Sequence, residues 1–421
     1  MRRHFLVFDR SLRQPPSNPR ITLSTGRFQL HNKKQERLFV LLYLSVCMAS
    51  VVAALQRTTG KAIMRAGVTP TVTEVTLQCS DGVTLAGQRW RAAGSEFNGS
   101  DDQSSRLLCL HGWMDNCRTF YQLAPAIVQA QPNVDLVALD LPGHGLSSHK
   151  GIDGPPALLA ELAYYVSCNV RCSESACSGS KTVSHMFPQV AEAIHQLGWA
   201  SPDGATKSQP DGEDSPSITL IGHSMGAGIG CLYSAAFPEQ IARLVLIEGA
   251  GPLAREATHV SQHVRNHIRR RLVGNQADTA KKQPRIYPSL EKAVETRCFT
   301  AKNFPGNQWL STEAATEMVL RATYAVGDQG EVQFRHDPRL QWPSIQYFTQ
   351  EQVESLYDNI SCPTALLLAE DGWPFDNERF QSTLDKLQPA VYHRLPGSHH
   401  FHADPDSSAM VADKVIDFLS M

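Results

Sequence analysis

Short apolar runs alternate with helix-compatible segments between residues 107 and 247, and this alternation constrains the fold more than any other feature of the sequence. The apolar runs are four to six residues long, as buried strands usually are. They cover residues 107–110, 134–139, 218–221 and 244–247, and the helical segments between them cover residues 120–128, 183–197 and 227–236. The pattern predicts βαβ units, and therefore an α/β fold in which a mostly parallel sheet carries helices on both faces.

The predicted sheet extends on both sides of this region. Residues 71–79 and 83–90 alternate polar and apolar side chains around the turn Ser80-Asp81-Gly82, which predicts a β-hairpin. Strand patterns return at residues 364–368 and 391–395, and a helical pattern closes the chain at residues 410–419.

Residues 254–358 separate the two parts of this pattern. They lack the strand rhythm and contain charged, helix-compatible segments, so we interpret them as a helical insert within one sheet domain. The α/β core is then residues 67–253 and 359–421. Arg265 and residues 269–271 form a basic run in the insert, which we interpret as a solvated helix face.

Two polar, turn-rich stretches, residues 167–181 and 201–216, are interpreted as surface loops. Cys168, Cys172 and Cys177 lie in the first. Their spacing implies no fourth ligand, so we interpret them as loop cysteines and expect no metal site there.

The N-terminal 66 residues form a basic tail with an apolar segment. Residues 1–37 contain nine Lys or Arg against two acidic residues, and residues 38–55 carry no charge over 18 positions. This length is near the minimum for a membrane-spanning helix, and the basic flank would keep the N-terminal side cytoplasmic. A mitochondrial or other organelle transit sequence, a late signal segment, and a chain that begins at Met64 are the alternatives.

Overall charge argues against nucleic-acid binding. The chain has 39 Lys plus Arg and 41 Asp plus Glu, a formal net charge of −2, so it has no global basic field. Its ten cysteines are too few for a disulfide scaffold. Neither observation predicts an oligomeric state.

The motif Gly222-His223-Ser224-Met225-Gly226 stands directly between a predicted strand and a predicted helix. A G-x-S-x-G sequence in this position is typical of a nucleophile elbow, in which glycines permit a sharp turn and the serine hydroxyl is exposed above the sheet. We therefore predict that Ser224 is a nucleophile.

A serine nucleophile needs an imidazole base, and the histidines of residues 399–402 follow the predicted strand 391–395. We favour His399, keep His400 as the alternative base, and expect His402 to pack nearby.

An acid must orient that imidazole. We favour Asp371, after the predicted strand 364–368. Glu370 and Asp376 in the same loop, and Glu248 after the predicted strand 244–247, are kept as alternatives, because a carboxylate at the end of either strand can reach the same imidazole.

An oxyanion requires two backbone N–H donors. The expected donors are the amides of Met225, which follows the nucleophile, and of Trp113, in the loop after the strand 107–110. Trp113 can also form a wall of the pocket.

Three sequences together resemble the α/β-hydrolase fold superfamily and, within it, the serine hydrolase-like protein family. They are LHGWMDN at residues 110–116, DLPGHGLSSH at 140–149 and GHSMGAG at 222–228. The resemblance implies a serine hydrolase with a helical cap formed by residues 254–358. It also implies an acid within Gly-x-x-Asp, but here the aspartate position is Gly372. Ser224 disfavours dehalogenase and epoxide hydrolase activities, which use a carboxylate nucleophile.

From these features we expect hydrolysis of an ester-like bond, an ester or acyl thioester of a small or medium hydrophobic substrate, through an acyl-enzyme and without a metal or organic cofactor. The alternatives are a hydrolase of C–C or amide bonds and a non-catalytic homologue that binds a ligand or a partner.

Overall fold

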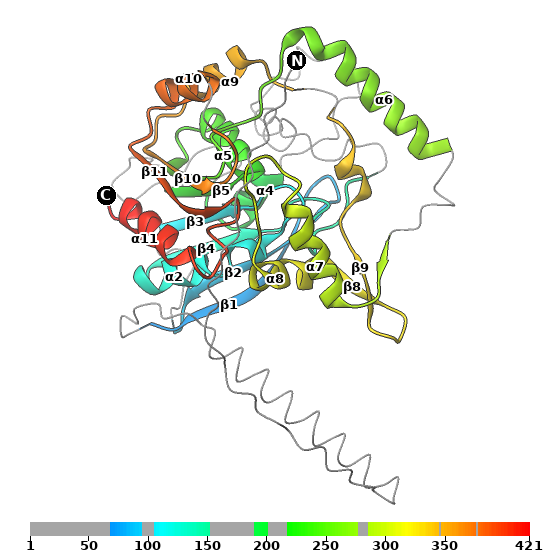
Figure 1. The fold of residues 1–421 in the computed structure, drawn as a ribbon. Coiled ribbons are helices and arrows are strands. Elements are labelled where there is room, and N and C mark those ends of the chain that lie inside the picture. The colour runs from blue at the N-terminus through cyan, green and yellow to red at the C-terminus, as the bar shows by residue number, and fades with distance from the viewer. Residues whose placement is uncertain are drawn as a thin grey trace, which may run out of the picture. The chain divides into compact units, whose positions relative to one another are not determined.

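Eight strands form one mixed sheet in the order β1-β2-β4-β3-β5-β6-β10-β11 (Figure 1). The computed structural model describes residues 68–94, 105–151, 189–200, 217–276, 285–344, 347–375 and 378–421. Contacts divide the chain after Ala62, and all described residues belong to the unit Ile63–Met421. The predicted apolar segment 38–55 and the predicted loops 167–181 and 201–216 lie outside the described residues.

The strands of this sheet match the predicted pattern closely. They are β1 (Pro70–Gln78), β2 (Thr84–Ala92), β3 (Ser105–Leu110), β4 (Val134–Leu139), β5 (Ile218–His223), β6 (Ile241–Ile247), β10 (Thr364–Asp371) and β11 (Val391–Ser398). β1 and β2 form the expected antiparallel hairpin, and β2 also pairs antiparallel with β4. All later pairs are parallel. The α/β class expected from the sequence is therefore confirmed.

Helices cover both faces of the sheet, because successive residues of a strand point to opposite faces. Leu107 and Cys109 of β3 belong to the apolar cluster that contains α2 and α11. Leu108 and Leu110 belong to the other cluster, with α4, α5, α9 and α10. The bounds are α2 (Leu123–Ala130), α4 (Gln189–Gln196), α5 (Met225–Ala236), α9 (Gln350–Tyr357), α10 (Glu378–Leu387) and α11 (Ser408–Leu419), with a 3-10 turn η1 (Cys117–Phe120) before α2.

The segment 254–358 contains a small sheet as well as helices, which the sequence analysis did not predict. Its elements are η3 (Ala257–His259), α6 (Val260–Gln276), β7 (Ile286–Tyr287), α7 (Leu290–Ala301), α8 (Thr312–Ala322), β8 (Thr323–Val326), β9 (Glu331–Phe334), η4 (Pro338–Gln341) and α9. The strands pair antiparallel in the order β7-β9-β8. The helical pattern of α8 stops at Ala322 because the next residues, Thr-Tyr-Ala-Val, are mostly strand formers and pair with β9.

A buried arginine ties this segment to the core. Arg321 of α8 donates to the buried carboxylate of Asp140 at 2.8 Å and to Glu74 of β1 at 2.9 and 3.0 Å. Asp140 also accepts the N–H groups of Cys117 and Leu146, both at 2.8 Å. One carboxylate therefore joins the insert to two loops of the core.

Within the described ranges, no helix is both long and apolar enough to cross a membrane. Because the segment 38–55 lies outside those ranges, its assignment as a membrane anchor stays a prediction.

Candidate active site

Ser224 occupies a tight turn between β5 and α5, as the motif predicts. Its φ is +52°, a conformation that side-chain-bearing residues rarely adopt, and its N–H donates to Ile247 O at 2.9 Å. A Cβ added to Gly226 would lie 2.0 Å from Leu110 O, and one on Gly222 would lie 2.4 Å from Gly226 O. Both flanking glycines are required because backbone segments approach each other too closely for a side chain.

Glu248 follows β6 directly and also has a positive φ, +51°. Its carboxylate is buried and accepts the N–H of Ala369 at 2.6 Å and that of Trp373 at 3.1 Å. The Nδ1 of His399 lies 2.9 Å from Glu248 Oε2, within hydrogen-bond distance. Glu248, one of the alternatives considered above, is thus the carboxylate that contacts this imidazole.

The favoured acid, Asp371, lies elsewhere, so this expectation is corrected. Asp371 is exposed at the end of β10, and among the described residues its carboxylate accepts a single hydrogen bond, from Asn307 Nδ2 at 3.5 Å. Glu370 is also exposed, and Asp376 lies outside the described residues.

Gly372 explains the departure from the Gly-x-x-Asp pattern. A Cβ at Gly372 would lie 2.2 Å from Glu248 Oε2, so the Glu248 carboxylate already fills the space next to this position. The carboxylate that contacts His399 is that of Glu248, directly after β6, and Gly372, which follows the end of β10, leaves room for it.

Ser224 and His399 are held by the same turn. The Ser224 N–H bonds to Ile247 O, His399 bonds to Glu248, and a Cβ on Gly249 would lie 2.8 Å from Ser224 O. Both side chains line one cavity of about 750 Å³. Within the described part of the chain the Ser224 hydroxyl makes no hydrogen bond, which leaves it available to a reacting group.

Burial dominates the electrostatics of this pair. It raises the pKa of Glu248 to about 7, although the N–H groups of Ala369 and Trp373 act in the opposite direction. Burial also holds the pKa of His399 well below its usual value, and the neighbouring His400 adds to this effect. Near neutral pH the imidazole is therefore unprotonated, as a general base must be.

His400, the alternative base, belongs to a second cluster of charged and polar side chains. Its Nε2 lies 3.0 Å from Asp115 Oδ2, and Arg297 of α7 donates to Asp115 Oδ1 at 2.7 Å. Burial alone would raise the pKa of Asp115, but the contacts with His400 and Arg297 outweigh it and hold the pKa well below normal. His400 and Asp115 also line the cavity, so two histidine–carboxylate pairs lie side by side.

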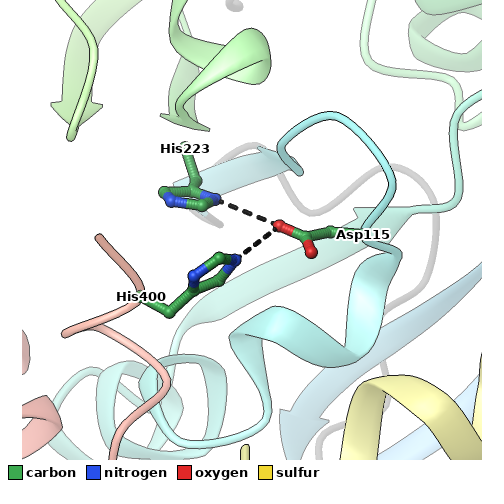
Figure 2. Close-up of side chains that lie close together, drawn as sticks. All are labelled: Asp115, His223 and His400. Atoms are coloured by element: carbon green, nitrogen blue, oxygen red, sulfur yellow. Dashed lines mark hydrogen bonds and ion pairs between the residues drawn. The ribbon is translucent and has the colours of Figure 1, made fainter. Parts of the chain in front are cut away.

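Figure 2 shows Asp115, His223 and His400 pointing toward one another. The His223 Nε2 donates to His399 O at 3.0 Å, and its Nδ1 lies 3.6 Å from Asp115 Oδ2. The three residues have the side-chain types and spacing of a metal site. The Arg297 cation, however, already neutralises Asp115 and would repel a divalent ion. We interpret these contacts as structural, because the bonds of His223 to His399 O and of His400 to Asp115 hold the loop that carries His399 in place.

His402 is buried, and its ring lies 4.2 Å from that of His223. Its Nε2 is 3.0 Å from Thr119 Oγ1. It therefore packs beneath the site, as expected.

The two expected oxyanion donors both border the cavity. Met225 is the first residue of α5, and Trp113 follows β3 by three residues. Among the described residues neither backbone N–H is used by a protein acceptor, so both stay available to a ligand. The indole of Trp113 donates to Leu340 O at 3.1 Å, which joins this loop to the insert. Trp113 is also part of the pocket wall.

The cavity lies between the core and the insert, and most of its wall is apolar or aromatic. The large apolar side chains are those of Trp113, Leu253, Tyr287, Phe304, Phe334, Leu340, Trp342, Tyr347, Phe348, Trp373 and Phe375. Such a wall favours an apolar ligand.

The sequence analysis missed Asp115, His223 and Arg297 as members of this site. Asp115 and His223 lie inside motifs that were recognised, at positions to which no role was assigned. Arg297 lies in α7 of the insert, and no pattern in the sequence relates it to Asp115.

Residues 107–414 match the alpha/beta hydrolase family. A serine hydrolase-like protein of Dictyostelium discoideum is 26% identical over 360 residues, 82% of this chain and 81% of that protein. A serine hydrolase-like protein of Danio rerio is 28% identical over 320 residues, 74% of this chain and 81% of that protein. The crystal structure of a hypothetical protein of Pseudomonas aeruginosa PAO1 matches with a TM-score of 0.63 and 28% identity, and covers 83% of this chain and 99% of its own. The predicted fold and resemblance are confirmed.

Proposed function

Because the chain belongs to the alpha/beta hydrolase family, we propose that it is a serine hydrolase that cleaves an ester or acyl thioester bond. Ser224 is the nucleophile, His399 the general base and acid, and Glu248 the residue that orients His399. The observation that carries the proposal is the 2.9 Å contact between Glu248 and His399, made on the turn that also holds Ser224.

In the proposed reaction, His399 Nε2 removes the proton of the Ser224 hydroxyl as its oxygen attacks the carbonyl carbon. The carbonyl oxygen becomes an anion, which the N–H groups of Trp113 and Met225 bind. The positive end of α5 adds to this stabilisation. His399 then protonates the leaving alcohol or thiol as its bond to the acyl group breaks. Water, activated by the same imidazole, releases the acid and restores Ser224.

Glu248 has a defined role in this cycle. When His399 accepts a proton it becomes a buried cation, which is costly unless an anion lies beside it. The ionised Glu248 carboxylate provides that anion at 2.9 Å, and the Ala369 and Trp373 N–H groups hold it in place.

The cavity supports the proposed class of substrate. Its volume of about 750 Å³ and its aromatic wall suit a small or medium hydrophobic acyl group.

Substrate profiling tests the proposal. The purified chain is given p-nitrophenyl esters, acyl thioesters and anilides with acyl chains of two to ten carbons, alongside Ser224→Ala. We expect turnover of esters or thioesters that Ser224→Ala reduces by at least about 1,000-fold. Turnover of anilides alone would indicate an amidase. Absence of turnover with every substrate and of any Ser224-dependent acylation would favour a non-catalytic binding protein.

A further inference from the structure

His267, on α6, lines the cavity and presents one unpartnered nitrogen to it. The residue is 6% exposed, and its Nδ1 donates to Pro343 O at 2.8 Å. The other ring nitrogen, Nε2, has no hydrogen-bond partner among the described residues. Nε2 is nevertheless accessible, so it is the polar atom of this buried ring that a molecule in the cavity can reach.

The imidazole of His267 has a fixed orientation. Its Nδ1 carries a proton, because the partner of this nitrogen is a carbonyl oxygen. The ring also meets Trp342 edge to face, with 6.2 Å between the centroids and 80° between the planes. Nε2 therefore has a lone pair in the neutral ring and a proton in the charged ring, and its direction is the same in both.

A short segment connects His267 to the candidate active site. The Trp113 indole donates to Leu340 O at 3.1 Å, and Pro343, three residues later, accepts the bond from His267. Three residues span at most about 11 Å, so Trp113 and His267 lie along one side of the cavity. Because the Trp113 N–H is a proposed oxyanion donor, a substrate bound at Ser224 can extend toward His267.

From these contacts we infer that His267 determines substrate specificity by binding a hydroxyl group of the substrate, away from the scissile bond. The cavity wall is mostly apolar, so a single well-placed polar atom decides which chains bind and in which orientation. The inference rests on the proposed function and narrows its substrate class to esters or acyl thioesters that carry a hydroxyl group.

The chemistry of the imidazole favours a hydroxyl over other polar groups. A hydroxyl can donate to the lone pair of the neutral ring or accept from the proton of the charged ring, so it pairs with Nε2 in either state. An amide would bring a carbonyl oxygen together with its N–H, and Nε2 pairs with only one of them.

Matched pairs of substrates test the inference. Each pair is an ester and the same ester with one hydroxyl, placed at successive carbons of the acyl chain or of the alcohol. Without a partner in the cavity, a hydroxyl lowers kcat/KM because it loses its bonds to water. We expect the hydroxyl to raise kcat/KM by about tenfold at one position at least. A lower kcat/KM at every position would overturn the inference.

His267→Asn separates recognition from packing. The asparagine amide can keep the bond to Pro343 O, but it has no atom in the place of Nε2. We expect the preference to reverse, so that the unsubstituted ester is the better substrate. An unchanged preference would show that another group binds the hydroxyl and would contradict the role of His267.

His263→Asn is the matched control, one turn earlier on α6. The His263 ring packs 4.6 Å from that of Tyr347, and we expect its replacement to leave the preference for the hydroxyl in place. Each preference is a ratio of two substrates measured on one preparation, so it does not depend on the fraction of the protein that is folded.

Binding to Ser224→Ala measures the preference without turnover. Calorimetry with the same pairs should give Kd values that differ about tenfold for one pair at least, and the difference should disappear when His267→Asn is added. Binding preference without turnover in the parent would overturn the proposed hydrolysis and leave the role of His267 intact. Turnover without any preference would overturn this inference alone.

Discussion

Glu248 Oε2 lies 2.9 Å from His399 Nδ1, although 151 residues separate them in the chain. The contact forms at the carboxyl edge of the sheet, where β6 ends before Glu248 and β11 ends before His399. Because Glu248 is buried and has two backbone donors, the imidazole meets a carboxylate in a fixed position.

Replacing Glu248 with Gln tests which carboxylate the reaction uses. We expect kcat on the best ester to fall by about 10,000-fold, because the buried imidazolium loses its anion, whereas Asp371→Asn should change kcat less than threefold. Steady-state kinetics of the two variants measures the difference. The reverse ranking would restore Asp371 as the acid.

The raised pKa of Glu248 also makes the free energy of unfolding depend on pH, and Glu248→Gln tests this dependence. Burial raises the pKa of Glu248 from 4.5 to about 7, so the folded state binds this proton more tightly than the unfolded state does. The contribution of protonated Glu248 to the free energy of unfolding is therefore complete below pH 4.5 and is lost as the pH rises through about 7. At pH 8, Glu248→Gln should therefore be at least as resistant to urea as the parent protein. A large loss of unfolding free energy would contradict this origin of the shift.

Moving the carboxylate from position 248 to position 372 tests whether these two positions share the space beside His399. Gly372→Ala should reduce kcat at least tenfold, because the new Cβ would lie 2.2 Å from Glu248 Oε2. Glu248→Gly combined with Gly372→Asp should recover part of the activity that Glu248→Gly loses, because the new carboxylate occupies the vacated space. If the double variant is no more active than the single one, the two positions do not share this space.

The pH dependence of kcat/KM should follow the ionisation of the Glu248 carboxyl group. Glu248 must be ionised to stabilise the imidazolium, so kcat/KM should fall as the pH is lowered through about 7 and should reach about one tenth of its plateau one unit below. Initial rates between pH 5 and 9 measure this limb, with circular dichroism to confirm folding at each pH. A flat profile down to pH 5 would contradict the assignment.

The two adjacent histidines should differ in effect. His399→Ala is expected to reduce kcat by at least 1,000-fold. His400→Gln, which removes a partner of Asp115 and leaves the Glu248 contact, should reduce it tenfold or less. If His400→Gln is the more damaging change, the pair of His400 and Asp115 carries the reaction.

The sequence predicted the sheet well because buried strands leave a strong local signal. Strand β4 was predicted with its observed bounds, and the turn at Ser224 was recognised because Gly222 and Gly226 are sterically required. β8 was missed because a helical pattern runs directly into it.

The acid could not be assigned in the same way. Strand ends place several carboxylates at one edge of the sheet, and their order in the sequence does not show which one turns inward. The positive φ of Glu248 decides this, and it depends on packing between distant segments. Gly372 was the available signal, because a glycine in place of an expected acid leaves room for another carboxylate.

Labelling with a fluorophosphonate, followed by peptide mapping, tests the central assignment most directly. We expect one adduct per folded chain, on Ser224, which is absent in Ser224→Ala, forms at least 100-fold more slowly in Glu248→Gln and His399→Ala, and forms at the parent rate in Asp371→Asn. An adduct on a different residue, or a folded chain that the probe does not label, would contradict the account.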